Sequence, residues 1–306
     1  MLLTASVIFG TGCTAAEAEK NAPDEKTYTD HMGRRVTIDG RPERVAVLIG
    51  SFADVWCLAG GRDSIVAAAG DSWTQFDLDL PEDTYNLGGI KEPSIEKLLA
   101  SEPDLVIGSA RTAADVEMEK MLGEIGIPVL YFDVSSFGEY LSMLEICCSI
   151  TGKTENYEKY GTEVQKQVDE AVKKADGFAP SVLYIRAAGS GCRVKNSEGS
   201  VLGEMLRELG CVNIADSETG LLENLSMETV LACDPDYIFA VLQGSDSSKA
   251  EKSLQNAVLS DPAWKSLSAV KNGRFHILDQ KLYNLKPNAR WGEAYEKLAE
   301  LICGRK

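Results

Sequence analysis

The sequence predicts an α/β protein of two doubly wound lobes, with one long helix between them and a ligand cleft where the lobes face each other. Three observations support this prediction. A helix–turn–strand unit occurs twice, β-branched runs alternate with helical patterns in both halves, and a long stretch without strand signals separates the two copies. At 306 residues the chain is long enough for two domains with sizeable cores.

The repeated unit covers residues 94–107 and 226–239, which align without a gap. In each copy a serine is placed to cap a helix, and an acid follows two residues later, where the helix dipole favours negative charge. Pro103 or Pro235 then ends the helix, because proline cannot donate a backbone hydrogen bond and restricts the residue before it. An apolar run follows, as in a buried strand. Two copies so far apart in the chain predict two similar lobes and not a solenoid.

Apolar runs and glycine breaks predict the elements of the first lobe. An alternating stretch between glycines indicates a small hairpin within residues 28–44. Continuous apolar runs, typical of buried parallel strands, cover residues 44–49, 64–69, 105–108 and 129–132. Helical spacing covers residues 52–59, 94–102 and 113–125.

From residue 136 to 174 apolar side chains recur at helical intervals, and Gly152 is the only early break, which predicts one long helix or two collinear ones. The second lobe then has strands over 181–185, 237–241 and 273–278, and helices over 201–209, 250–259, 262–267 and 291–303. The predicted organisation is a lipoprotein signal and tether (1–27), an N-terminal lobe (28–135), an interlobe helix (136–176) and a C-terminal lobe (177–306).

The N-terminus has the features of an export signal. Residues 2–12 are apolar but too short to span a bilayer as a helix, and Cys13 and a polar stretch follow. This order resembles a bacterial lipoprotein signal, in which cleavage before Cys13 would leave its thiol to carry lipid. An ordinary chain terminus with a free cysteine is the alternative interpretation.

Composition and motifs argue against several function classes. The net charge of −16 argues against a nucleic-acid partner, because phosphate binding needs a basic face. The eight cysteines form no CxxC pair or Cys/His spacing, so no metal site or cofactor is expected. With two histidines and no G-x-S-x-G elbow, P-loop or H-E-x-x-H motif, the sequence does not predict an enzyme.

Four sequence elements together resemble a known family. They are Asp30-x-x-Gly33-Arg34-x-Val36, Pro42-x-Arg44-Val45, the repeated unit with its Pro-Asp pair, and the closing run Lys271–Phe275. With the lipobox-like start, they resemble the class III substrate-binding lipoproteins of ABC importers over nearly all of residues 28–302. The resemblance implies two lobes joined by one rigid helix, and a monomer anchored by lipid on the extracytoplasmic face of the cell membrane. It also implies delivery of an iron–siderophore complex, haem or a corrinoid to a permease and its ATPase.

The predicted cleft follows from the position of the strands. Ligands of open α/β sheets lie beyond the carboxyl ends of the strands, and the segments there are rich in cations and aromatics. Cations gathered in an acidic protein favour an anionic ligand, since arginine binds carboxylate or phenolate oxygens bidentately, and aromatic side chains pack on flat rings. The predicted ligand-binding residues are Ser51, Phe52, Trp73, Lys91, Arg111, Arg186, Arg193, Tyr283, Arg290 and Trp291.

Some of these residues have an equally simple structural role. Arg186 is the strongest candidate, because it follows a buried strand within a glycine-rich turn, and Arg111 has the same position in the first lobe. Trp291 is equally expected to anchor the last helix, whereas Arg193 and Lys195 fit a solvated loop.

The ligand class stays open among three chelates. The arginines favour a ferric siderophore, haem would need an axial ligand, for which Tyr283 is the nearest candidate, and a corrinoid would rely on aromatics and neutral donors. A two-lobed oxidoreductase subunit with a metal cluster is the alternative from another class. Its cluster would have to use Cys57, Cys147 and Cys148, which lie within helical apolar runs.

Glu96 and Glu228 occupy equivalent positions in the two repeat copies. Each is explained simply as a favourable charge near a helix N-terminus. In the resembled family an acid on each lobe pairs with arginines of the permease, so the resemblance implies that Glu96 and Glu228 dock onto a two-fold symmetric partner.

Overall fold

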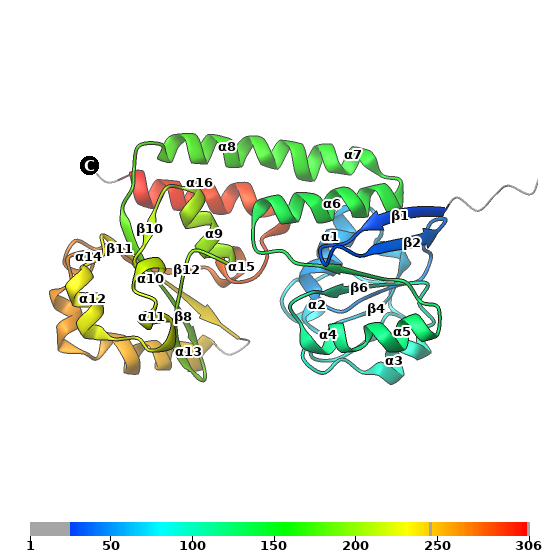
Figure 1. Ribbon diagram of the computed structural model, residues 1–306, viewed down its shortest axis with the longest axis horizontal. Helices are drawn as coiled ribbons and strands as arrows, with labels where there is room; N and C mark the ends of the chain where they lie inside the picture. The colour runs from blue at the N-terminus through cyan, green and yellow to red at the C-terminus, as the bar shows by residue number, and fades with distance from the viewer. Residues whose placement is uncertain (1–24, 245–246, 305–306) are drawn as a thin grey trace, which may run out of the picture.

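The computed structural model describes residues 25–244 and 247–304. Two α/β lobes lie side by side beneath a shared layer of helices, with the N-terminal lobe at the right and the C-terminal lobe at the left (Figure 1). The predicted fold class is therefore confirmed. Cys13 and the predicted signal lie outside the described residues, and within these residues no helix has the length and apolarity that crossing a membrane requires.

The N-terminal lobe is built on a parallel sheet in the order β5-β4-β3-β6-β7. Its strands are β3 (Val45–Val47), β4 (Ile65–Ala68), β5 (Tyr85–Asn86), β6 (Leu105–Ser109) and β7 (Val129–Phe132). The helices are α1 (Gly50–Leu58), η1 (Arg62–Ser64), α2 (Asp71–Thr74), α3 (Ile95–Ala100), α4 (Ala113–Glu117) and α5 (Glu119–Glu124). The predicted hairpin precedes them as β1 (Glu25–Thr29) and β2 (Arg35–Asp39), which pair antiparallel.

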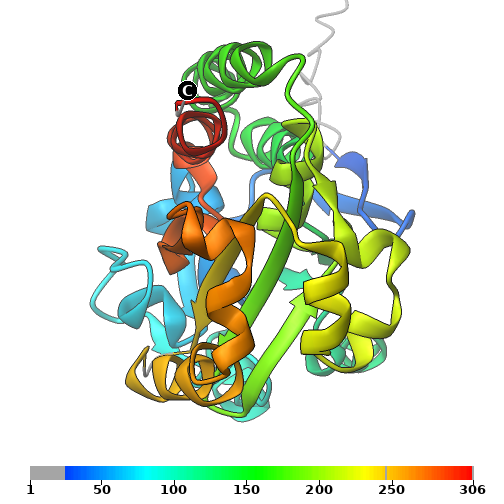
Figure 2. The ribbon, with the colours of Figure 1, turned by 90° about the vertical axis from the view of Figure 1, so that its left-hand side faces the viewer.

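The C-terminal lobe repeats this plan in the order β10-β8-β11-β12, and β9 pairs antiparallel with β8. Its strands are β8 (Ser181–Ala188), β9 (Gly191–Lys195), β10 (Val212–Asn213), β11 (Tyr237–Gln243) and β12 (Phe275–Leu278). The larger helices are α9 (Val201–Glu208), α12 (Met227–Cys233) and α13 (Ser247–Leu254). Short helical turns complete the lobe: α10 (Ile214–Ser217), α11 (Gly220–Glu223), η3 (Gln255–Leu259), η4 (Pro262–Ser266), α14 (Ser268–Lys271), α15 (Gln280–Tyr283) and η5 (Asn288–Arg290). Helices flank the strands on both sides when this lobe faces the viewer (Figure 2).

The helical layer is an antiparallel pair and not a collinear one. Helix α6 (Phe137–Thr151) ends at Gly152, whose φ of 69° is left-handed, and the chain reverses there. The helix that pairs with α6 is continuous through α7 (Thr154–Tyr157), the π-helical turn η2 (Glu158–Thr162) and α8 (Glu163–Ala175). It runs above both lobes (Figure 1). The hydroxyl of Tyr140 on α6 donates to the carbonyl of Tyr160 on η2 at 2.9 Å, and this hydrogen bond joins the two antiparallel helices.

The repeated sequence unit forms the same local structure twice. The hydroxyls of Ser94 and Ser226 accept hydrogen bonds from backbone N–H groups three residues on, and these caps start α3 and α12. The residue before each proline, Glu102 or Asp234, has positive φ (45° and 39°), and the buried strands β6 and β11 follow. The prediction of helix, tight turn and buried strand is confirmed in both copies.

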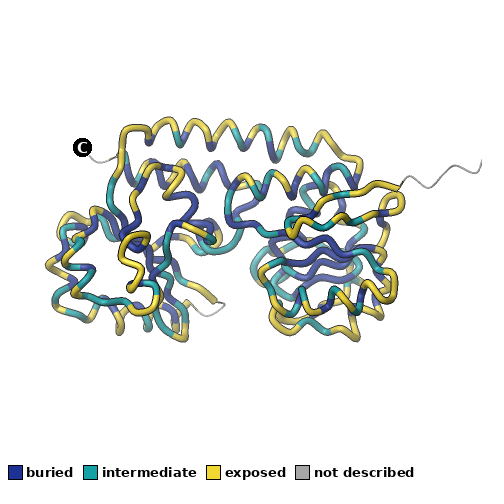
Figure 3. The backbone as a smooth tube through the Cα atoms, in the orientation of Figure 1, coloured by how far each residue is buried: buried dark blue, intermediate teal, exposed yellow. Residues whose placement is uncertain are grey.

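One hydrophobic core extends through the helical layer into both lobes. Trp291, the first residue of α16 (Trp291–Cys303), is fully buried against Phe137, Tyr140 and Tyr295. Burial is concentrated along the sheets and the undersides of the helices (Figure 3). Because the lobes share this core, a relative motion of the lobes would disturb close-packed side chains.

Candidate functional site

A cavity of about 240 Å³ lies between the lobes, at the carboxyl ends of strands from both sheets. Its walls come from strand ends, loops and helix starts of both halves of the chain. They are Ile49, Ser51, Asp71, Phe76, Ile90, Arg111, Val134, Ser135, Arg186, Gly199, Ser200, Val201, Gln243, Asn284, Leu285 and Lys286. The strand-end rule therefore locates this cavity from the order of the elements alone.

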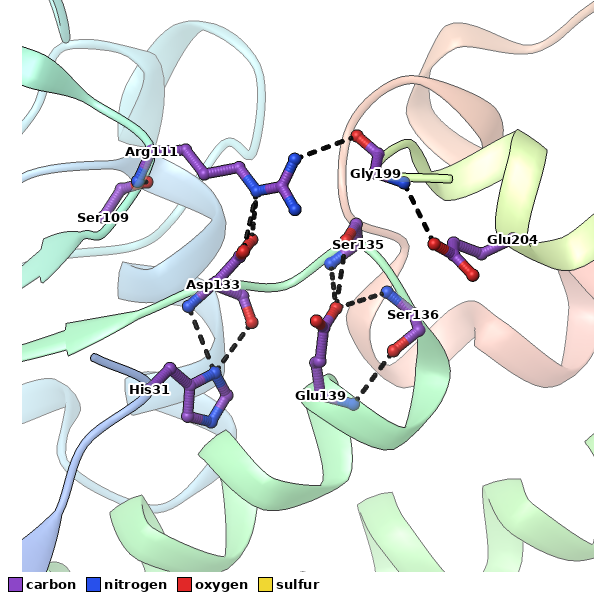
Figure 4. Close-up of polar contacts among 9 residues, drawn as sticks. All are labelled: His31, Ser109, Arg111, Asp133, Ser135, Ser136, Glu139, Gly199 and Glu204. Atoms are coloured by element: carbon purple, nitrogen blue, oxygen red, sulfur yellow. Dashed lines mark hydrogen bonds and ion pairs between the residues drawn. The ribbon is translucent and has the colours of Figure 1, made fainter. Parts of the chain in front are cut away.

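Arg111 reaches from the N-terminal lobe to the C-terminal lobe (Figure 4). Its Nε lies 2.6 Å and 2.7 Å from the two carboxylate oxygens of Asp133, and its Nη1 donates to the carbonyl of Gly199 at 3.3 Å. Hydrogen bonding to Asp133 raises the pKa of Arg111, so its charge is permanent. Asp133 holds the Nε edge of the guanidinium and Gly199 accepts from Nη1, so the side chain is fixed between the two lobes.

The loop that carries Asp133 is itself held in place. His31 Nδ1 lies 2.7 Å from the carbonyl oxygen of Asp133, and the Glu139 carboxylate accepts hydrogen bonds from the backbone N–H groups of Ser135 (2.7 Å) and Ser136 (2.8 Å) (Figure 4). Burial alone would raise the pKa of Glu139, but these hydrogen bonds outweigh it and lower that pKa. Arg111 is thus oriented by Asp133, and the loop of Asp133 is held in turn by His31, after β1, and by Glu139 on α6.

Arg186 lies in β8 and not in the glycine-rich turn predicted from the sequence, because the strand continues to Ala188. It pairs with Arg193 across β9, and Tyr184 pairs with Lys195, so all four side chains share one face of the hairpin. Arg186 donates to the Tyr184 hydroxyl from Nε (3.3 Å) and Nη2 (3.1 Å). Burial, with Arg186, Arg111 and Arg193, lowers the pKa of Lys195.

Lys286 is a cavity residue that the sequence analysis missed. Burial lowers its pKa, Arg186 and Arg111 lower it further, and Asp133 and Asp71 act in the opposite sense. The carboxylate of Asp71 accepts a hydrogen bond from the N–H of Gly50 at 2.9 Å, and burial raises its pKa. Lys286 lies between Tyr283 and Arg290, two residues that the sequence analysis predicted at the cleft, and a cation in that stretch was the available signal.

Three predicted ligand residues lie in the core and not in the cavity walls. Phe52, Tyr283 and Trp291 are at most 2% exposed and belong to the core. The ring of Phe52 packs edge-on against Phe132, the Tyr283 hydroxyl donates to the carbonyl of Ala294 at 3.0 Å, and Trp291 packs among aromatic rings. Each of these three side chains lies on the side of its own helix that faces the interior of the protein.

Of the other predicted ligand residues, three line the cavity and four lie elsewhere. Ser51, Arg111 and Arg186 are in its walls. Trp73 packs at the edge of the core, Lys91 is exposed next to a wall residue, and Arg193 lines a separate hollow on β9. Arg290 is paired on the surface with Glu293, at 2.7 Å and 3.0 Å.

Glu96 and Glu228 are both exposed, in the first turns of α3 and α12. Within residues 25–244 and 247–304, neither acid forms an ion pair or a side-chain hydrogen bond. Among the same residues, no group of three or more His, Cys, Asp or Glu side chains is arranged to hold a metal ion.

Two doubly wound lobes with a charged cavity between them define a ligand-binding protein of the two-lobed type. The chain belongs to the periplasmic binding protein family, whose sequence model matches residues 45–282. This match confirms the family predicted from the sequence.

Named relatives and a solved structure extend this comparison. The chain is 23% identical over 295 residues to the probable siderophore-binding lipoprotein YfiY of Bacillus subtilis, covering 91% of this chain and 89% of the relative. It is 24% identical over 293 residues to a cobalamin-binding protein of Halobacterium salinarum, covering 92% and 76% respectively. The structure of Staphylococcus aureus SirA complexed with staphyloferrin B is similar in fold, with a TM-score of 0.68, 24% identity and coverage of 90% and 96%.

Proposed function

We propose that this protein is the extracytoplasmic substrate-binding lipoprotein of an ABC importer, and that it captures an anionic ferric chelate of the siderophore type. The observation that carries the proposal is the gathering of cations at the cavity. Arg111, Arg186 and Lys286 line it from both lobes, and Arg193 and Lys195 share the hairpin face of Arg186.

This gathering is unfavourable unless an anion is bound. The chain as a whole carries a net charge of −16, yet these cations lower the pKa values of Lys195 and Lys286 by mutual repulsion in addition to burial. Asp133 and Asp71 offset only part of the positive charge. A bound anion would relieve the repulsion, and a cleft lined by one sign of charge also raises the local concentration of an oppositely charged ligand.

The other ligand classes find less support in the cavity. Haem needs an axial donor such as His, Tyr, Met or Cys, and none of these residue types is among the cavity walls of the described chain. A corrinoid was expected to rely on aromatics and neutral donors, and Phe76 is the aromatic side chain in the walls of the described chain, beside the charged groups. A cluster-bearing oxidoreductase is disfavoured because Cys147 and Cys148 are buried in the core and burial raises the pKa of Cys57 to about 12.

Delivery to the importer would use the two repeated helix starts. Glu96 and Glu228 are exposed, acidic and placed once per lobe, which suits a two-fold symmetric permease with basic docking sites. The relative YfiY is named a lipoprotein, and this supports lipid attachment at Cys13 and a position on the extracytoplasmic face of the membrane. We propose the protein as a monomer in this role.

The binding step can be tested by quenching of the four tryptophans during titration with ferric chelates, haem and cobalamin. We expect saturable quenching by a ferric chelate, weakened about tenfold or more by Arg111→Ala or Arg186→Ala. Arg290→Ala is the matched control, because that arginine is paired with Glu293 outside the cavity. Binding of haem or cobalamin alone, or equal effects of all three variants, would contradict the proposal.

The docking step has its own test. In proteoliposomes that contain the permease and ATPase, Glu96→Ala with Glu228→Ala should reduce ligand-stimulated ATP hydrolysis while leaving the affinity for the chelate unchanged. Wild-type stimulation by the double variant would remove the docking role from these acids.

A further inference from the structure

Three large apolar side chains are exposed on two neighbouring elements of the N-terminal lobe, and we call them the α3 patch. Tyr85 on β5 is 41% exposed, and Ile95 and Leu99 on α3 are 43% and 40% exposed. Helix α3 packs beside β5, where Lys97 Nζ donates to the carbonyl of Asn86 at 2.9 Å. Single exposed apolar side chains are ordinary on a protein surface, but a group of them is typical of an interaction site.

Glu96 lies next to the apolar residues of this patch. Residues three and four positions apart are neighbours on a helix surface, so Leu99 lies beside both Glu96 and Ile95. Glu96 is exposed, and among the described residues its carboxylate has no cationic partner. Helix α3 lies at the end of its lobe that points away from the shared helical layer (Figure 1). The α3 patch therefore presents apolar area beside one negative charge that is not neutralised.

The second copy of the repeated unit provides an internal comparison. Met227 and Leu231 on α12 occupy the positions of Ile95 and Leu99 on α3. Both are only partly exposed and pack against the hydrophobic core of the C-terminal lobe, and the turn η4 packs against α12. The same sequence unit thus has its apolar positions covered in one lobe and exposed in the other, whereas its acid is exposed in both.

Charge decides what kind of partner fits the α3 patch. A symmetric contact between two copies of this chain would place two Glu96 carboxylates close together and would join two molecules of net charge −16. A partner that offers apolar side chains beside a basic residue meets no such repulsion. The basic docking sites proposed for the permease have this charge, and the α3 patch is continuous with the acid proposed to dock there.

We infer that the two lobes bind the permease unequally. The N-terminal lobe binds through the α3 patch together with Glu96, and the C-terminal lobe binds mainly through the charge of Glu228. This inference rests on the proposed function. Attraction between exposed charges is screened by salt, whereas burial of apolar surface is not. The contact of the N-terminal lobe is therefore the one that persists at high ionic strength.

The test measures the dissociation constant between the full chain and the importer's permease and ATPase in nanodiscs, at about 0.05 M and about 0.5 M NaCl. The Ile95→Ser, Leu99→Ser double variant should bind about tenfold more weakly at both salt concentrations. Glu228→Gln should bind about fivefold more weakly at the lower salt concentration and like the wild type at the higher one.

Two further variants complete the set. Tyr85→Ser is a second probe of the α3 patch and should weaken binding about threefold at both salt concentrations. Val212→Ser is the matched control, because Val212 is an apolar residue on β10 of the other lobe, 57% exposed, and should bind like the wild type. All the replaced side chains are exposed, so every variant should keep the melting temperature and the chelate affinity of the wild type.

The other outcomes separate this inference from the proposed function. Wild-type affinity of the double variant and of Tyr85→Ser, or a loss confined to the lower salt concentration, would overturn the inference but leave the proposed function standing. Self-association of the wild type that the Ile95→Ser, Leu99→Ser variant abolishes would also overturn it, because the patch would then bind a second copy. A wild-type chain that binds the chelate but not the permease and ATPase would overturn the proposed delivery step, and this inference with it.

Discussion

Gly199 gives the most direct test of how Arg111 is positioned. Its φ of +65° is left-handed, and a Cβ at this position would lie 2.8 Å from Nη1 of Arg111. Gly199→Ala therefore has two effects: a backbone cost of about 1 kcal/mol for alanine in this conformation, and displacement of the guanidinium. Moving Arg111 should weaken binding of the ferric chelate by about fivefold, which corresponds to about 1 kcal/mol of a charge-assisted hydrogen bond.

Gly152→Ala separates these two effects. Gly152 has nearly the same φ, +69°, but a Cβ there would meet nothing within 4 Å. Both variants should melt about 2–4 °C below the wild type in a thermal scan. In a fluorescence titration, only Gly199→Ala should bind the ferric chelate more weakly. Equal affinities of the two variants would show that the position of Arg111 does not matter for binding, and the reasoning would fail.

Three further predictions concern charge and burial. Because burial and nearby arginines lower the pKa of Lys286, affinity for an anionic chelate should fall as the pH rises through that pKa, below the ordinary 10.5 of lysine. Lys286→Met should abolish this step in a pH series of titrations, and a step that persists would assign it to another group. Burial raises the pKa of Asp115 from 3.8 to about 7, so the native state retains a proton that the unfolded chain releases. The free energy of unfolding in urea should therefore fall as the pH rises from about 4 to about 7, and Asp115→Asn should flatten this dependence. Asn288 donates at 2.8 Å to both the Ser51 carbonyl and the Asp54 carboxylate. Asn288→Ala should therefore lower the free energy of unfolding by about 2–4 kcal/mol. A loss under about 0.5 kcal/mol would show that these hydrogen bonds between the lobes do not stabilise the fold.

The fold was predictable because its signals are local. The capping serines, the prolines and the apolar runs of the repeated unit act within a few residues, and they form the same helix–turn–strand structure in both lobes. The reversal of the chain direction at Gly152 was harder to predict from the sequence. A glycine indicates that a helix ends there, but the direction that the chain then takes depends on distant packing, such as the hydrogen bond from Tyr140 to Tyr160.

The candidate site could be predicted from the sequence as a location in the fold, but only partly as a set of side chains. Strand order fixes which backbone segments reach the cavity, and Ser51, Arg111 and Arg186 follow from it. It does not fix the direction of each side chain. Ser51 and Phe52 are neighbours in α1 and point about 100° apart around the helix axis, so Ser51 meets the cavity while Phe52 enters the core.

The two arginines of the cavity differ in what holds them, and this difference assigns them different roles in the binding that we propose. Arg111 is held by Asp133, so much of its positive charge is neutralised locally, but its remaining donors are fixed in direction. Arg186 is held by the neutral hydroxyl of Tyr184 and keeps its full charge in the cavity. Long-range attraction of an anion depends on net charge, whereas selection among bound anions depends on oriented donors. In the proposed binding step, Arg186 together with Lys286 would therefore supply most of the attraction, and Arg111 would contribute chiefly to the geometry of recognition.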